Sequence, residues 1–164
     1  GRKISTPTRW QFSGNLDATF VPFTGNILPV SPDYTIENTT RTAKNERITG
    51  YYKNSEITIG MNVTRVGQTT GEKSGKITST SYSFGSKNPE TGKIDAYVND
   101  FIKYTCYSEG GDSGGTVFHE FIGPLGQNEI RPITMVGIHT NVNAGCKIET
   151  ILNTFNLSLY YYVK

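Results

Sequence analysis

Short β-prone segments follow one another at small intervals through most of this 164-residue chain. From Ile48 onward they are separated by Gly, Asn or other turn-forming residues, and 18 glycines in all supply many turn positions. Closely spaced strand signals with turns between them are typical of sandwiches and barrels. The predicted strands include Tyr51-Tyr52 and residues 56–59, 61–66, 75–82, 94–98, 101–106, 115–118 and 133–140. The chain is therefore predicted to be antiparallel and all-β.

The two ends of the chain differ from this pattern. Ile148, Ile151, Leu152 and Phe155 recur at spacings of three and four, which predicts one short C-terminal helix. Residues 16–23 form another β-prone segment, whereas residues 24–47 are rich in Pro, Asn and Thr and lack periodicity. We therefore expect a boundary at residue 47 between segments 1–47 and 48–164. Residues 124–128 are predicted to be a loop.

Charge and composition exclude several classes of function. The formal net charge is +2, and the basic residues are dispersed without a run of four, so nucleic acid is not an expected partner. No apolar stretch approaches the roughly 20 residues of a transmembrane helix, so no membrane association is expected. Two histidines and two cysteines without Cys-x₂-Cys spacing do not make a zinc set, and no metal or cofactor is expected.

The run Gly111-Asp112-Ser113-Gly114-Gly115 carries the clearest chemical signal. Its glycines allow backbone angles that other residues resist, and they let a substrate carbonyl approach the main chain closely. The amides of Gly111 and Ser113 can then point at one developing oxyanion. The run precedes a strand-like Thr116-Val117-Phe118, so Ser113 is placed where a nucleophile is exposed.

This motif resembles the active-site motif of chymotrypsin-like serine peptidases, and the likeness extends to residues 60–63, 67–71, 74–78 and 136–139. It is most similar to the bacterial streptogrisin-like branch and covers residues 48–164 almost throughout. The resemblance implies a six-stranded antiparallel Greek-key β-barrel, the second of two, with the tail of the first barrel in residues 1–47. It also implies a secreted enzyme that hydrolyses polypeptides, with Ser113 as nucleophile. Gly111 and Ser113 would supply the oxyanion hole, and Asp112 would make a structural contact with an unnamed partner.

Asp17 is the candidate for the acid of the catalytic triad. Its segment, Leu16 to Val21, is similar to the family's segment with the catalytic aspartate. The interval from Asp17 to Ser113 is close to the family's interval between these two residues. The alternative is a strand-edge aspartate that faces solvent.

A catalytic base is missing from this arrangement. A serine hydroxyl needs a neighbouring base to accept its proton, and in this family the base is a histidine before the aspartate. His119 and His139 are the two histidines of the chain, and both follow Ser113. We therefore expect a C-terminal part of a two-barrel peptidase, inactive by itself, whose histidine comes from a separate N-terminal segment. The alternative is a non-catalytic binding or inhibitory protein of the same fold.

The resemblance also assigns a specificity pocket and a disulfide. Ser108, His139 and Thr140 would line the S1 pocket, and Gly137-Ile138-His139 resembles the segment of glutamyl endopeptidases whose histidine faces the substrate carboxylate. The alternative is a packed histidine beside a pocket for small or aromatic side chains.

The two cysteines, Cys106 and Cys146, taken alone, could be free thiols, a disulfide or metal ligands. In the streptogrisin-like branch, a disulfide joins the two segments in which they lie. A disulfide would imply an oxidising compartment. The three glycosylation-type triplets at residues 38–40, 62–64 and 156–158 permit secretion.

Overall fold

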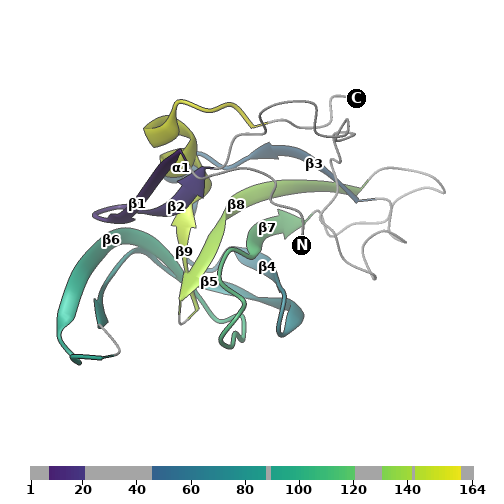
Figure 1. The fold of residues 1–164 in the computed structure, drawn as a ribbon. Coiled ribbons are helices and arrows are strands. Elements are labelled where there is room, and N and C mark those ends of the chain that lie inside the picture. Colours follow the sequence, from purple (N-terminus) through teal and green to yellow (C-terminus); the bar gives the residue numbers. More distant parts are fainter. Residues whose placement is uncertain (1–7, 21–45, 88–89, 121–130, 142, 160–164) are drawn as a thin grey trace, which may run out of the picture.

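The computed structural model describes residues 8–20, 46–87, 90–120, 131–141 and 143–159. The strands are β1 (Arg9–Ser13), β2 (Leu16–Phe20), β3 (Glu46–Tyr51), β4 (Asn62–Gly67), β5 (Gly71–Lys87), β6 (Ile94–Tyr104), β7 (Thr116–Glu120), β8 (Arg131–Asn141) and β9 (Ala144–Lys147). One α-helix, α1 (Ile148–Phe155), lies in this described part, together with a 3₁₀ turn over Asn54–Glu56. Figure 1 shows their arrangement.

Six strands close into an antiparallel barrel in the order β4-β5-β6-β9-β8-β7, and β7 pairs with β4 again. Strand β3 lies outside this ring and pairs parallel with β8. Inside the barrel, the strands contribute large apolar residues such as Val63 of β4, Ile77 of β5, Ile102 of β6 and Val117 of β7, each at most 2% exposed. Full burial of such a side chain contributes roughly 1.5–3 kcal/mol. The predicted six-stranded antiparallel barrel is confirmed.

The predicted turn between residues 67 and 71 joins β4 to β5, with Gly67 paired to Gly71. Gly71 has φ +65°, which favours glycine. The prediction of a strand over residues 56–59 is wrong. The segment begins in the 3₁₀ turn, where the carboxylate of Glu56 accepts a hydrogen bond of 2.8 Å from the amide of Lys53, and that local bond competes with strand pairing.

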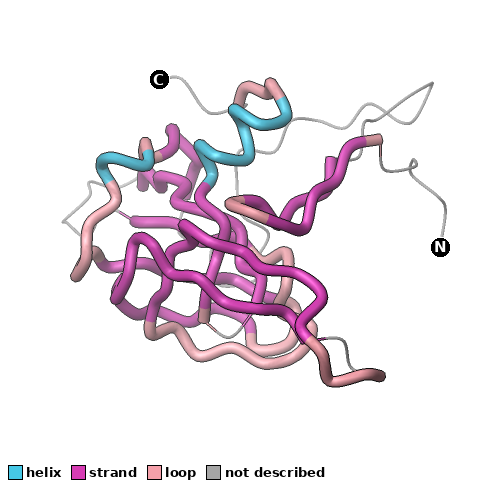
Figure 2. Tube along the Cα trace, turned by 90° about the vertical axis from the view of Figure 1, so that its left-hand side faces the viewer, coloured by secondary structure: helices cyan, strands magenta, loops and turns pink. Residues whose placement is uncertain are grey.

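Strands β1 and β2 form a separate hairpin that packs beside α1 (Figure 2). Leu16 is fully buried in a cluster with Phe101 of β6 and Phe155 of α1. Two backbone hydrogen bonds, Gly14 N to Tyr97 O at 3.0 Å and Asn99 N to Gly14 O at 2.6 Å, attach the hairpin turn to β6. These contacts fix β2 and therefore Asp17.

The predicted strand over residues 16–23 starts where expected, and residues 21–23 lie outside the described part. The predicted loop over residues 124–128 also lies outside it. Strand β3 begins at Glu46, and the domain boundary at residue 47 stays a prediction.

The C-terminal helix matches its prediction. Ile148, Ile151, Leu152 and Phe155 are its buried apolar residues, and they pack against the hairpin and against strands β3, β7 and β8. The helix ends at Asn156, whose left-handed φ of +51° allows the amide of Leu157 to donate to the Leu152 carbonyl at 2.8 Å.

The disulfide expected between Cys106 and Cys146 is not present, and this prediction is corrected: both cysteines are buried free thiols. The Sγ of Cys106 faces the Val63 carbonyl at 3.6 Å inside the barrel. The Sγ of Cys146 faces the Asn15 carbonyl at 3.4 Å in the cluster beneath the hairpin. The two thiols therefore belong to different parts of the core. Burial raises the pKa of each to about 11, so both stay protonated at neutral pH.

Candidate active site

Ser113 lies in the loop between β6 and β7, and its side chain is exposed. Backbone hydrogen bonds attach this loop to β8: the amide of Gly114 donates to the His139 carbonyl at 2.8 Å, and the amide of His139 donates to the Gly115 carbonyl at 2.7 Å. The Ser113 hydroxyl donates to the carbonyl of Thr140. The loop thus holds an exposed hydroxyl against the end of β8.

The neighbouring Asp112 is buried and anchors the loop. Its carboxylate accepts hydrogen bonds from the amides of Thr69, Thr70 and Glu109 at 2.9–3.0 Å and from the Thr70 hydroxyl at 2.8 Å. Arg65 of β4 lies 3.3 Å from it, and both side chains are 0% exposed. Burial by itself would raise the pKa of Asp112, but these hydrogen bonds hold the pKa well below its usual range.

The sequence analysis predicted a structural partner for Asp112 without naming it, and that partner is Arg65. The guanidinium also donates to the Thr70 hydroxyl and to the carbonyl of Tyr107. These bonds connect β4, the β4–β5 turn and the serine loop.

The peptide between Gly110 and Gly111 is held from one side by Thr69. The Thr69 hydroxyl donates to the Gly110 carbonyl at 2.8 Å. In a trans peptide the N–H points opposite to the C=O, so the Gly111 amide points away from Thr69. Gly111 has φ +97°, and a Cβ there would overlap the Thr69 hydroxyl, so only glycine fits. Within the described residues, neither the Gly111 amide nor the Ser113 amide has a hydrogen-bond acceptor. Both stay available to an oxyanion.

Asp17 of β2 lines a cavity of about 520 Å³ together with Ser113. Ile138, His139 and Thr140 of β8 complete much of its wall. Burial raises the pKa of Asp17, and among the described residues none donates a hydrogen bond to its carboxylate. A carboxylate and a serine hydroxyl therefore face one cavity, and the carboxylate has capacity for a donor placed in that space.

A second cavity, of about 340 Å³, lies on another side of Ser113. Ser108, His139 and Thr140 all line it, as the sequence predicted for a specificity pocket, and Asn143 joins them. The Ser108 hydroxyl donates to the Asn143 side-chain carbonyl at 2.8 Å. The predicted pocket residues are thus brought together beside the serine.

The chain superposes on several solved protease structures. A chymotrypsin of Cellulomonas bogoriensis superposes with a TM-score of 0.68 and 24% identity, and the match covers 96% of this chain and 76% of that one. A glutamic-acid-specific serine protease, described as using a histidine triad in substrate binding, superposes with a TM-score of 0.61 and 20% identity. That match covers 98% of this chain and 75% of the protease. A Nocardiopsis protease superposes with a TM-score of 0.59 and 21% identity, and the match covers 93% of this chain and 71% of that one.

The chain has the chymotrypsin fold. No family model matches it, and no curated protein does. The predicted resemblance to bacterial chymotrypsin-like serine proteases is confirmed at the level of the fold.

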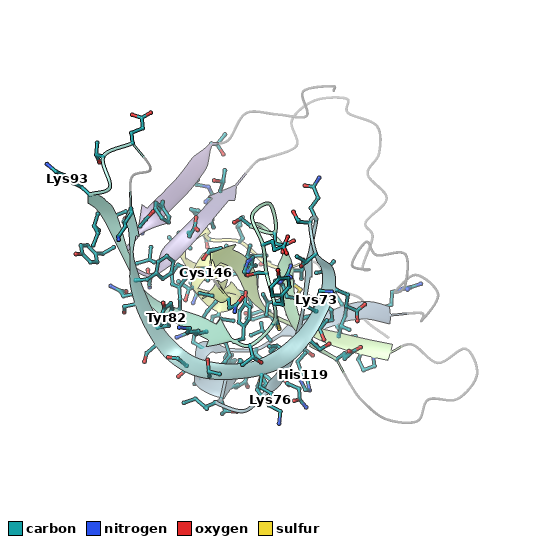
Figure 3. All side chains as sticks on the ribbon, turned by 90° about the horizontal axis from the view of Figure 1, so that it is seen from below. Lys73, Lys76, Tyr82, Lys93, His119 and Cys146 are labelled. Atoms are coloured by element: carbon teal, nitrogen blue, oxygen red, sulfur yellow. The ribbon has the colours of Figure 1, made fainter. Side chains whose placement is uncertain are left out.

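In this chymotrypsin fold, His119 lies away from the serine. Its Nδ1 is 2.7 Å from the Asn62 carbonyl oxygen, and its ring makes an edge-on contact with Tyr52 at 5.9 Å. It lines a different cavity, beside Lys76, at the outer side of the barrel (Figure 3). His119 is therefore not placed to take a proton from Ser113.

His139 is 2% exposed, and its Nδ1 lies 2.6 Å from the Tyr104 hydroxyl. Burial, followed by the positive charge of Arg65, lowers the pKa of His139 to about 4. It lines both cavities beside Ser113, with one ring nitrogen already engaged.

Sequence reasoning missed three residues that shape the site, namely Arg65, Thr69 and Tyr104. Arg65 interrupts a β-branched run, Val63-Thr64-Arg65-Val66, and that interruption could have marked it as a buried cation. No comparable signal marks Thr69 or Tyr104.

Over the residues that the structure covers, no group of three or more His, Cys, Asp or Glu side chains could hold a metal ion. Over the same residues, the one α-helix is too short to cross a bilayer.

Proposed function

We propose that this chain is the nucleophile-bearing part of a serine endopeptidase whose base histidine comes from a segment outside these 164 residues. The observation that carries the proposal is the cavity shared by Asp17 and Ser113. An imidazole between them could accept the Ser113 proton on one ring nitrogen and donate to Asp17 from the other. The chymotrypsin fold of the neighbours supports a polypeptide substrate.

The reaction would use the remaining groups in turn. Once the histidine removes its proton, the Ser113 oxygen attacks the scissile carbonyl carbon, and the amides of Gly111 and Ser113 stabilise the oxyanion. The imidazolium then protonates the leaving amine, which leaves an acyl-enzyme that water hydrolyses. Asp112 touches no reacting atom and acts by holding the loop through Arg65.

The chain alone is expected to be nearly inactive. Loss of a triad member can cost on the order of 10⁶ in kcat. Neither His119 nor His139 is expected to replace the base, because His119 lines a separate cavity and the Nδ1 of the buried His139 is already engaged with the Tyr104 hydroxyl. The glutamic-acid-specific neighbour is described as using a histidine triad in substrate binding. This chain has no counterpart of that triad among its described residues, because its two histidines line separate cavities.

A non-catalytic binding protein of the same fold is the second candidate, and the missing base favours it. The amides of Gly111 and Ser113 oppose it, because a binding module has no need of two amides that lack an acceptor among the described residues beside an exposed serine. Secretion, which the resemblance implied, stays a prediction, and the free thiols remove the disulfide as an argument for it.

The test is to purify the native material, record its intact mass under non-denaturing and denaturing conditions, and assay peptide hydrolysis before and after any complex is dissociated. The proposal expects a histidine in a segment outside these residues, either in a native polypeptide heavier than 18.1 kDa or on a second polypeptide, and in the second case activity that is lost on dissociation and recovered on mixing. A lone 18.1 kDa chain without activity supports the binding protein. A lone chain that hydrolyses peptides at an ordinary protease rate contradicts the need for an external base.

A further inference from the structure

In the described part of the chain, the charged side chains that line the cavities beside Ser113 are acidic. Besides the two cavities described above, a third one of about 470 Å³ also has Ser113 in its wall. Asp17 lines the cavity of about 520 Å³, and Glu109 lines the cavity of about 340 Å³. Neither lysine nor arginine is among the described residues of the three walls. A substrate that reaches Ser113 therefore meets an anionic surface.

Glu109 is attached to the smaller cavity through both its main chain and its side chain. Its amide donates to the Asp112 carboxylate at 2.9 Å. Its own carboxylate accepts a hydrogen bond from the hydroxyl of Tyr107, which lines the same cavity. Both Tyr107 and Glu109 are exposed, so the negative charge of Glu109 lies where the cavity opens to solvent.

The two groups that could neutralise this charge from inside the protein do not do so. The guanidinium of Arg65 reaches the Tyr107 carbonyl, but it is fully buried and lies 3.3 Å from the Asp112 carboxylate, whose charge balances its own. His139 is 2% exposed, and burial, followed by the charge of Arg65, lowers its pKa to about 4 against the opposing effect of Asp112. The ring is therefore neutral at pH 7, and the charge of Glu109 is left without compensation.

The remaining polar groups of the wall are neutral. The Ser108 hydroxyl donates to the Asn143 side-chain carbonyl, so the Ser108 oxygen is left as an acceptor and the Asn143 amide group as a donor. The neutral ring of His139 offers one acceptor or one donor, according to which nitrogen carries the hydrogen. The side-chain oxygen of Thr140 is buried within the protein.

These groups discriminate between side chains by charge. A carboxylate would lie beside the like charge of Glu109, and the neutral donor of Asn143 does not replace a counter-charge. An ammonium or guanidinium group would pair with Glu109 and could donate to the Ser108 oxygen. A neutral side chain would experience neither the attraction nor the repulsion.

We propose, on the basis of the proposed peptidase function, that Glu109 makes this cavity select a cationic P1 side chain, lysine or arginine, over glutamate. Glu109 is then a specificity-determining residue. Tyr107 is a positioning residue, because its hydroxyl holds the Glu109 carboxylate at the cavity. The preference is opposite to that of the glutamyl endopeptidases whose Gly-Ile-His segment residues 137–139 resemble.

The test measures binding and needs no turnover. N-acetyl tetrapeptides that differ only in a C-terminal Lys, Arg, Gln or Glu are titrated against the chain at pH 7.5. The Kd of the tighter cationic peptide should be roughly tenfold or more below that of the Glu peptide, because a like-charge repulsion replaces an attraction. The Gln peptide should lie between them. The formal net charge of the chain is +2, so its overall charge would favour the Glu peptide and cannot produce this order.

Three variants locate the selection at Glu109. Glu109→Gln should bring the Kd values of the Lys and Glu peptides within roughly threefold of each other, and Glu109→Lys should reverse their order. Glu56→Gln is the matched control, because Glu56 is an exposed carboxylate in the 3₁₀ turn and does not line these cavities. It makes the same change in net charge and should leave the preference as in wild type.

Salt gives a second readout of the same charge. The ratio of the two Kd values should fall when NaCl is raised from about 20 mM to about 500 mM, since salt screens exposed charges. Tyr107→Phe should weaken the preference and leave the midpoint of urea unfolding unchanged. An unchanged preference in Tyr107→Phe contradicts the positioning role.

Several results would overturn the selection itself. They are a Glu peptide that binds at least as tightly as both cationic peptides, a preference that survives in Glu109→Gln, an equal loss of preference in Glu56→Gln, and no binding of any peptide at millimolar concentration. Acylation of Ser113 in the native material by a fluorophosphonate is measured separately. Selectivity without acylation refutes only the peptidase proposal, and acylation without selectivity refutes only this one.

Discussion

The buried pair of Arg65 and Asp112 predicts a large loss of stability when the carboxylate alone is neutralised. Both side chains are 0% exposed, and the carboxylate accepts four further hydrogen bonds. In Asp112→Asn, an amide NH₂ would face donors, and the Arg65 charge would stay buried without compensation. Breaking a buried ion pair from one side costs about 3–5 kcal/mol. For a chain of this length, that loss corresponds to a fall in Tm of roughly 6–20 °C.

Asp100→Asn is the matched control. Asp100 pairs with Lys147 at 2.6 Å, but its carboxylate is 45% exposed, and asparagine tolerates its φ of +58°. We expect a loss of about 1 kcal/mol or less there. Urea unfolding followed by far-UV circular dichroism measures both variants. A loss below 1 kcal/mol in Asp112→Asn, or equal losses in the two variants, would refute the reasoning.

The pH dependence of Asp112→Asn gives an independent check. The folded-state pKa of Asp112 lies below its unfolded value of about 4, so its stabilisation is fully present above pH 4 and is lost as the pH falls further. The difference in unfolding free energy between wild type and Asp112→Asn should therefore shrink below pH 4. A difference that is constant from pH 7 to pH 2 would show that the charge of Asp112 plays no part.

Three further predictions test other parts of the fold. Cys106 and Cys146 should resist a thiol reagent at pH 8 in the native chain and give two thiols per chain in guanidinium; a native mass two hydrogens lower would instead show a disulfide. Gly137→Ala should cost about 1–3 kcal/mol in urea unfolding, because its Cβ would overlap the Cys146 carbonyl oxygen, whereas Gly50→Ala, with open space around its Cβ, should cost less than half as much. Asp17→Asn should stabilise the isolated chain at pH 7 and have no effect below pH 3. The raised folded-state pKa of Asp17 means that its ionised carboxylate destabilises the folded state above the unfolded pKa, and asparagine removes that charge. Destabilisation at pH 7 would contradict this account.

Local pattern was sufficient for much of the fold. The 3–4 spacing of Ile148, Ile151, Leu152 and Phe155 located the helix, because that spacing places these side chains on one buried face. The Gly67–Gly71 turn followed from turn chemistry. Residues 56–59 were misassigned, because a β-prone Ile-Thr-Ile was outweighed by a local hydrogen bond to Glu56.

The site was predictable only where a motif or a resemblance marked it. Ser113 and Asp17 were assigned from short segments, and the structure places both on one cavity. Tyr104 could not be identified, because its role depends on a contact across the barrel with His139 that no local pattern records. The disulfide was predicted from the resemblance alone, and it failed because the two thiols face different core clusters.

The most direct test of the central claim supplies the missing base as a small molecule. The isolated chain is treated with a fluorophosphonate at pH 7.5, and the rate of labelling at Ser113 is followed by mass spectrometry while free imidazole is increased. The account predicts very slow labelling without imidazole and a saturable acceleration with it, because imidazole can occupy the cavity of about 520 Å³ between Asp17 and Ser113. Ser113→Ala should abolish labelling, and Asp17→Asn should remove the acceleration. Fast labelling without imidazole, or an acceleration that is linear and equal in Asp17→Asn, would contradict the claim.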